Sequence, residues 1–92
     1  MYHVIPSNKY TKSLKRIGQH KNFQIKKLDE IVSLLKNNEK LAPQYKDHEL
    51  KGEYAGIREC HIQNDILLLY RKDKNVLVLL LVNIGTHSHL FE

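Results

Sequence analysis

The chain has 92 residues and a formal net charge of +5, from fifteen Lys and Arg against ten Asp and Glu. This length predicts one domain over residues 1–92, and the basic balance favours a polyanion or an acidic protein as partner. The single cysteine excludes an internal disulfide framework, and the longest apolar run, residues 76–82, is too short to span a bilayer as a helix, so we expect a cytoplasmic protein without membrane contact.

The first half of the chain predicts a strand followed by two helices. Residues 2–5 are a short β-type run, which Pro6 ends because proline cannot donate to a strand ladder. Ser7 is a suitable N-cap for a first helix, and Gly18 is expected to end that helix in a left-handed conformation. A second helix over residues 22–37 has apolar residues at helical spacing, so the two helices should form a hairpin.

The second half predicts an antiparallel meander. Residues 45–53 have no clean periodicity and are expected to form a loop or a strand edge. Three strands follow, over residues 57–62, 66–71 and 76–84. The order β, αα, βββ predicts an α+β protein with the helix pair packed on one face of the sheet. The last strand is apolar throughout, so its other face must be covered by C-terminal residues, by chain curvature or by a partner.

The first strand of this meander gathers groups that are suited to acid–base chemistry. Side chains alternate along a strand, so Glu59 and His61 share one face, while Arg58 and Cys60 share the other. Because Cys60 is expected to face the helices, Glu59 and His61 should lie on the open face. Asp65 follows just beyond the next turn. A carboxylate and an imidazole side by side predict a shared catalytic site on the open face.

Further histidines come from other parts of the chain, which contains six. His48 precedes the meander and His87 follows it, and both can reach the open face. His3 and His20 are expected to be solvated surface residues. A single histidine is more often a tolerated polar residue than a functional one. The combination of these histidines with Glu59 is what favours a site.

Metal binding is a competing use of the same residues. His87 and His89 with Cys60 or His61 would supply nitrogen and sulfur ligands, but the spacing matches no standard zinc pattern. Cys60 is expected to be an inert buried thiol. We therefore expect neither a metal nor another cofactor.

Basic and aromatic residues complete the candidate site. Lys46, Lys51 and Arg58 lie in the same segments as the histidines and would suit a reaction that builds charge on a phosphate. Phe91 could stack on a base or plug the end of the sheet, and the sequence favours the plug. Further lysines and an arginine cluster on the predicted helices and also favour a polyanion or an acidic partner.

Four segments together resemble the YafQ-type toxins of the RelE/ParE superfamily of bacterial type II toxin–antitoxin systems. They are YKDHELKG at residues 45–52, RECH at residues 58–61, Asp65, and GTHSHLF at residues 85–91. The similarity covers nearly the whole chain, because length and element order also fit. Each segment alone would be weak, whereas the set is specific.

The resemblance implies a ribosome-dependent endoribonuclease that cuts mRNA in the ribosomal A site. It also implies a cognate antitoxin as partner, with operator DNA contacted only indirectly through that antitoxin. The family's catalytic positions fall on four residues of this chain, which are His48, His61, Asp65 and His87. Glu59 stands where relatives have an acidic residue, and Phe91 where relatives hold the substrate base. His89 matches no family-wide role.

Metal-free RNA cleavage needs a base that takes the 2′-OH proton and an acid that protonates the departing 5′-oxygen. Imidazoles suit both roles because their ordinary pKa is about 6.5. We expect His48 or His61 as the base, supported by Asp65, and His87 as the acid. Two alternatives remain at this point, a non-enzymatic inhibitor of DNA gyrase with the same fold and a basic RNA-binding module. Neither needs the histidine set, which therefore favours the nuclease.

Overall fold

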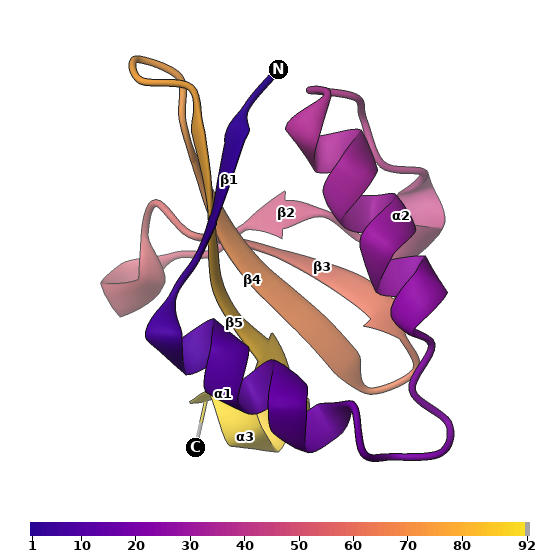
Figure 1. Ribbon diagram of the computed structural model, residues 1–92. Coiled ribbons are helices and arrows are strands. Elements are labelled where there is room, and N and C mark those ends of the chain that lie inside the picture. The colour runs from indigo at the N-terminus through magenta and orange to yellow at the C-terminus, as the bar shows by residue number, and fades with distance from the viewer. Residues whose placement is uncertain (92) are drawn as a thin grey trace.

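A five-stranded sheet with strand order β1-β5-β4-β3-β2 forms the centre of the protein in a computed structural model that describes residues 1–91 (Figure 1). The strands are β1 (His3–Pro6), β2 (His48–Glu49), β3 (Arg58–Gln63), β4 (Ile66–Asp73) and β5 (Val78–Gly85). The helices are α1 (Asn8–Ile17), α2 (Ile25–Lys36) and α3 (His87–Phe91), with short 3₁₀ turns η1 (Pro43–Tyr45) and η2 (Gly52–Tyr54). The α+β prediction is confirmed. Residue 92 of the predicted domain lies outside the described residues.

The sheet is mixed, and this corrects the expectation of an antiparallel sheet. β2, β3, β4 and β5 pair antiparallel in sequence order, as the short turns between the predicted strands indicated. β1 instead pairs parallel with β5, so that His3 lies opposite Val78. Strands joined by short turns must run antiparallel, but β1 and β5 are joined by most of the chain. No local pattern therefore reveals the direction of β1.

Both ends of α1 depend on single residues. The Ser7 hydroxyl accepts a hydrogen bond from the Tyr10 N–H at 2.9 Å and donates to the Val82 carbonyl at 2.7 Å, which ties the start of the helix to β5. The N-cap prediction is confirmed. Gly18 has φ −66°, so the expected left-handed conformation is wrong. A Cβ at Gly18 would lie 3.0 Å from the Leu14 carbonyl oxygen, so glycine allows the backbone of residue 18 to lie close to that oxygen.

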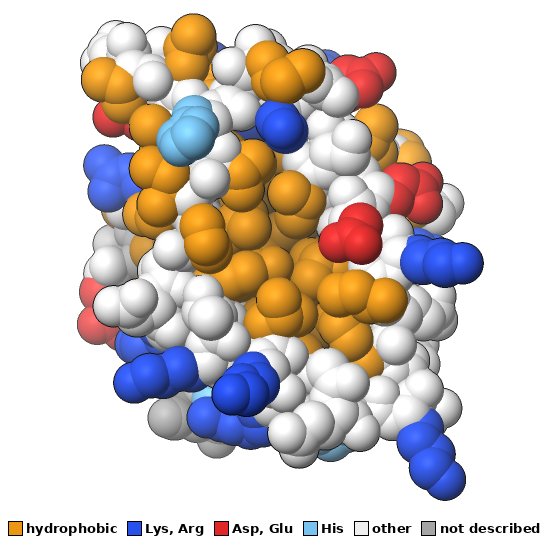
Figure 2. All heavy atoms as spheres, in the orientation of Figure 1, with side chains coloured by type: hydrophobic (Ala, Val, Ile, Leu, Met, Phe, Trp, Pro, Cys, Tyr) orange, Lys and Arg blue, Asp and Glu red, His pale blue; other side chains and the backbone are white. Residues whose placement is uncertain are grey.

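The helices α1 and α2 lie on the same face of the sheet but cover different strands (Figure 1). α1 contacts β5 and α2 contacts β3, so the expected hairpin is an open one. α2 begins at Ile25, three residues later than predicted. In Figure 2, hydrophobic side chains gather on the surface in the angle between α1, α2 and β1. Partly buried residues such as Val4, Leu14 and Val32 border the buried core.

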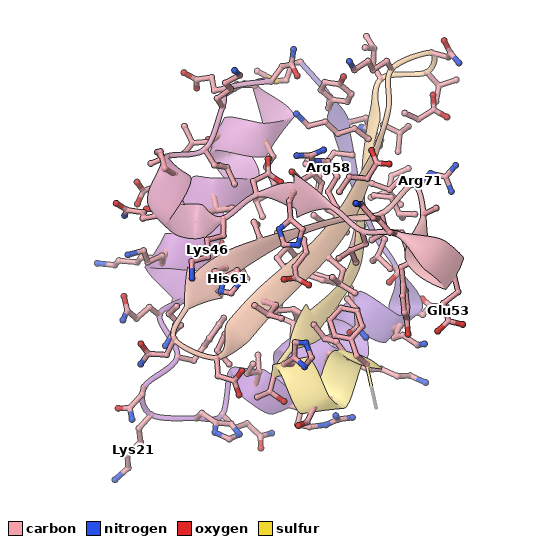
Figure 3. The ribbon with its side chains drawn as sticks, turned by 180° about the vertical axis from the view of Figure 1, so that it is seen from behind. Lys21, Lys46, Glu53, Arg58, His61 and Arg71 are labelled. Atoms are coloured by element: carbon pink, nitrogen blue, oxygen red, sulfur yellow. The ribbon has the colours of Figure 1, made fainter. Side chains whose placement is uncertain are left out.

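The opposite face of the sheet is covered in part by the C-terminal residues. In Figure 3, α3 lies in front of the end of β5 and α1 lies behind it. Leu67 and Leu69 on β4 are buried, although they alternate with the core residues Leu68 and Tyr70 on the helix-covered side. Of the three covers that were expected for the last strand, the C-terminal residues are thus observed. No helix within residues 1–91 is long and apolar enough to cross a membrane.

The start of the last strand differs from the prediction. Val76 and Leu77 were expected in the strand, but both are exposed and precede β5. Leu77 has φ +54°, a turn conformation that a bulky residue rarely adopts. The strand was predicted to begin at Val76 only because Val76 and Leu77 are hydrophobic, whereas both residues lie in the turn before β5.

Candidate active site

The strand register places Glu59 at the centre of the open face. Glu59 on β3 lies opposite His48 on β2 and opposite Leu69 on β4. His61 follows two residues later on the same strand and therefore points to the same side. The expected alternation of β3 is observed, since Cys60 belongs to the core under the helices.

The carboxylate of Glu59 is shared by two imidazoles. Its Oε1 atom lies 3.9 Å from Nε2 of His48 and 3.6 Å from Nε2 of His61. The side chain of Glu59 is only 9% exposed, against 51% for His48 and 32% for His61. Burying a carboxylate is costly unless polar partners compensate it. Each imidazole can pair with the carboxylate through Nε2 when that nitrogen carries a proton, and both side chains are partly exposed to solvent.

A backbone carbonyl fixes the tautomer of His48. Nδ1 of His48 lies 2.7 Å from the carbonyl oxygen of Lys46, which can only accept a hydrogen bond. Nδ1 therefore carries the proton, and Nε2 of the neutral ring is left with a free lone pair. Lys46 adopts φ +49°, which turns the chain so that its carbonyl faces the ring. His48 is thus arranged to accept a proton through Nε2.

His61 borders a polar hollow of about 410 Å³. Lys27 and Lys46 line the same hollow, together with Tyr45 and Asn64. Figure 3 shows Lys46 and His61 next to each other, with Lys21 far from both. Two lysines beside an imidazole give this hollow the charge that suits a phosphate backbone.

His87 and Phe91 lie one helical turn apart on α3 and pack together. Their ring centroids are 5.0 Å apart, and Phe91 meets Tyr54 of η2 edge to face at 5.2 Å. The imidazole of His87 belongs to an exposed residue, whereas Phe91 is partly buried. Phe91 lies between α3 and η2, where it packs with His87 and Tyr54 and stays partly exposed.

Arg58 lies on the other face of β3 and is not brought together with Glu59 and His61. Its Nε atom donates to Oδ1 of Asp47 at 3.2 Å and to the Tyr70 hydroxyl at 3.3 Å. The Tyr70 hydroxyl donates to the same Asp47 oxygen at 2.5 Å. Burial acts to lower the pKa of Arg58, but the bonds to Tyr70 and Asp47 outweigh it and raise that pKa. Burial, followed by the bond to Asp47, raises the pKa of Tyr70.

The Asp47–Arg58–Tyr70 cluster therefore holds the segment that carries Lys46 and His48. Asp47 lies between those two residues in the chain, and its carboxylate is tied to β3 and β4. In this arrangement the guanidinium of Arg58 is bound to Asp47, which precedes His48 in the chain.

The remaining predicted residues lie at the margins. Asp65 is exposed in the turn between β3 and β4, and it forms no ion pair within residues 1–91. The register of β4 and β5, with Leu67 opposite Gly85, brings this turn to the end of β5, just before His87. Lys51 is exposed at the start of η2. Burial, and then Asp47 and Glu59, raises the pKa of Cys60 to about 12, as expected for an inert thiol.

Three contributors were not predicted from the sequence, namely Asp47, Tyr70 and Tyr54. Asp47 stands beside His48 within the YKDHELKG segment, so its position was the one available signal. Tyr70 and Tyr54 read as ordinary hydrophobic residues. Within residues 1–91 no three His, Cys, Asp or Glu side chains converge as a metal site would require.

Comparisons with known proteins agree with this fold. Residues 2–92 match the family of bacterial toxins of type II toxin–antitoxin systems called YafQ. The mRNA interferase toxin YafQ of Escherichia coli K12 is 37% identical over 87 residues, covering 92% of this chain and 90% of that protein. A metal-bound toxin from Helicobacter pylori superposes with a TM-score of 0.91 at 42% identity, covering 99% of this chain and 100% of the other.

A third relative is YafQ of E. coli in a crystal structure of its complex with DinJ. It superposes with a TM-score of 0.86 at 30% identity, and each chain is covered completely. The fold and the family match define a toxin of a type II toxin–antitoxin system. The chain belongs to the YafQ family of these toxins.

Proposed function

We propose that this toxin is an endoribonuclease that cleaves mRNA on the ribosome by metal-free acid–base chemistry. The observation that carries the proposal is the buried carboxylate of Glu59 between the imidazoles of His48 and His61. The naming of the E. coli relative as an mRNA interferase supports it. A gyrase inhibitor or a plain RNA-binding module would have no use for this arrangement.

The 2′-OH of the substrate is the nucleophile, and His48 is the preferred base. Its Nδ1–H is held by the Lys46 carbonyl, so Nε2 is free to take the 2′-OH proton while the oxygen attacks the adjacent phosphorus. Glu59 then stabilises the imidazolium that forms. His61, next to the same carboxylate, is the second candidate for this role.

His87 protonates the 5′-oxygen as its bond to phosphorus breaks, so one proton is taken up and one is released in each turnover. Asp65 supports the site from the neighbouring turn, and Phe91 holds the base next to the scissile phosphate. Lys46 and Lys51 contact the phosphate backbone and steady the charge on the phosphorane.

The partners follow from the same role. We propose that a cognate antitoxin neutralises this toxin, as DinJ is bound to the E. coli relative. The apolar surface between α1, α2 and β1 is suited to such a protein partner (Figure 2). Operator DNA is contacted only through the antitoxin. The working place is the cytoplasm, where ribosomes and mRNA meet.

The test is mRNA cleavage in a purified translation system, mapped by primer extension for the native chain and for His87→Ala. Ribosome-dependent cuts by the native chain, with a loss of about 10²- to 10⁴-fold for His87→Ala, are expected. The variant should still bind ribosomes. Cuts of equal rate by both chains would remove His87 from the acid role. No cuts by either chain would refute the nuclease, and a DNA supercoiling assay would then test gyrase inhibition.

A further inference from the structure

The helix α3 is too short to be stable alone. It has five residues, and an isolated helix of that length does not persist in water. At its start, the Thr86 hydroxyl accepts a hydrogen bond from the His89 N–H at 3.2 Å, and the Thr86 carbonyl accepts one from Leu90 at 3.0 Å. Its orientation must come from contacts with the rest of the protein. That orientation decides where His87 and Phe91 point.

The two histidines of α3 project to different sides. Residues two positions apart on a helix are about 200° apart around its axis. His87 packs with Phe91, four residues later, toward η2. His89 projects the other way, toward α1.

His89 connects α3 to α1 through two side chains. Its Nε2 atom lies 3.3 Å from the hydroxyl oxygen of Ser13, which is 5% exposed. Nη1 of Arg16 lies 3.2 Å from Nδ1 and 3.3 Å from Nε2 of the same ring. A guanidinium has only donors, so Arg16 can donate only to a ring nitrogen of His89 that carries no proton. These contacts link residues more than seventy positions apart in the chain.

Gly85 provides the space that the ring occupies. A Cβ added at Gly85 would lie 2.7 Å from Cδ2 and 3.3 Å from Cγ of His89. The backbone of Gly85 has no left-handed φ, so the glycine is needed for space and not for conformation. The ring also borders an open cavity of about 260 Å³ between α1 and the start of β4, and His89 itself is exposed to solvent. His89 thus fits between β5 and α1 as a spacer.

We propose that His89 is a positioning residue, which holds α3 between Gly85 and α1 and thereby sets the direction of His87 and Phe91. The proposal accounts for the different contacts of the two histidines that flank Ser88, since His87 packs with Phe91 and His89 contacts α1. Its effect on cleavage rests on the proposed nuclease function. Its effect on the conformation of α3 does not.

A double-mutant cycle between Gly85 and His89 tests the proposal. Gly85→Ala should push the ring of His89 out of place, and His89→Ala should remove the spacer. We expect each to slow single-turnover mRNA cleavage by about 10- to 100-fold at saturating ribosomes, with ribosome affinity unchanged. Gly85→Ala should cost little more when His89→Ala is already present, because the clashing atoms are gone. Ser88→Ala, on an exposed residue between the two histidines, is the matched control and should cleave normally.

The second readout is NMR of the native chain and the same variants without ribosomes. Nuclear Overhauser contacts between the rings of His87 and Phe91, and between Phe91 and Tyr54, should weaken in both single variants. His89→Asn, which keeps a polar group toward Ser13 and Arg16, should restore part of the signals. Additive losses in the cycle would overturn the proposal, as would unchanged ring contacts in a folded His89→Ala protein.

The two readouts separate this proposal from the nuclease proposal. If the native chain cuts no mRNA while the ring contacts move as expected, the nuclease function fails and the positioning role stands. If His89→Ala does not fold, the NMR measurement is made on two other single variants, Arg16→Ala and Gly85→Ala. Intact ring contacts in both of these folded variants would refute the role of His89.

Discussion

The Oε1 atom of Glu59 lies 3.6 Å from Nε2 of His61, with the carboxylate buried and the imidazole partly open to solvent. The same oxygen also faces His48 at 3.9 Å. The negative charge is therefore held inside the protein, next to two imidazoles whose side chains are partly exposed to solvent. Water competes poorly for a carboxylate that is 9% exposed, so its charge acts mainly on the two rings.

Glu59→Gln should slow mRNA cleavage while the protein stays folded. Glutamine keeps the size of the side chain but carries no charge, so the imidazolium formed during proton transfer loses its counter-charge. We expect the single-turnover rate to fall by about 10- to 100-fold. The measurement is the rate of appearance of the primer-extension stop on ribosome-bound mRNA.

Glu49→Gln is the matched control for this change, since Glu49 is the neighbouring exposed glutamate on β2. It should cleave at the native rate. A normal rate for Glu59→Gln would exclude any need for the charge between His48 and His61.

Lys46→Ala should weaken RNA binding more than Lys21→Ala does. Lys46 lies beside His61 at the polar hollow, whereas Lys21 projects into solvent far from it (Figure 3). Loss of one phosphate contact should reduce the slope of log affinity against log salt by about 0.7 for single-stranded RNA. Fluorescence anisotropy with a labelled RNA at several salt concentrations measures both slopes. Equal slopes for the two variants would show that Lys46 does not contact the backbone.

Asp47→Ala should destabilise the fold by about 1–3 kcal/mol, because it leaves the Tyr70 hydroxyl and the Arg58 guanidinium without their shared acceptor. Urea unfolding followed by circular dichroism measures this free energy. Asp47→Asn keeps an acceptor oxygen and should lose less. Cleavage should also fall for Asp47→Ala, because the segment with Lys46 and His48 is released from the sheet. A fully stable Asp47→Ala protein would contradict the anchoring role.

The protein should lose stability in alkaline solution. Burial raises the pKa of Cys60 from 9.0 to about 12, and burial followed by Asp29 raises that of Tyr10 from 10.0 to about 12. Both groups hold their protons more tightly when folded. The stability that they contribute is complete below the unfolded pKa and is lost as the pH rises from 9 or 10 toward 12.

Thermal unfolding from about pH 7.5 to about pH 11 tests this expectation. The Tm should fall above about pH 9, and Tyr10→Phe should give a shallower decline than the native chain. Cys60→Ala, which lacks the thiol, should do the same. A native Tm that is constant across this range would show that neither group titrates differently on folding.

Much of the open face could be predicted because β-strand alternation is a strict geometric rule. Glu59 and His61 had to share a face opposite Cys60, and the structure has them so. His48 needed more than alternation, since the two-residue strand β2 has no periodicity to recognise. The resemblance of residues 45–52 to a segment of the YafQ-type toxins was the signal that placed His48 in one site with Glu59.

Other features depend on contacts between distant parts of the chain, and no local pattern encodes them. The parallel pairing of β1 with β5, the Asp47–Arg58–Tyr70 cluster and the fit of His89 over Gly85 are of this kind. Residue chemistry suggested Arg58 as a phosphate ligand, but its strand position turns it toward Asp47. The predicted left-handed conformation of Gly18 was wrong. Glycine is suited to this position because a Cβ would lie too close to the Leu14 carbonyl oxygen, and not because the backbone needs a positive φ.

The pairing of β1 with β5 has a consequence for how the toxin is made. A translating ribosome delivers β1 long before β5, the strand that pairs with it among residues 1–91, and β5 is followed directly by α3 with His87 and Phe91. The nascent chain therefore has to wait for β5 before β1 can pair and the sheet can be completed. The native arrangement of the toxin, with α3 against the end of β5, therefore forms only after residues 78–91 have been synthesised.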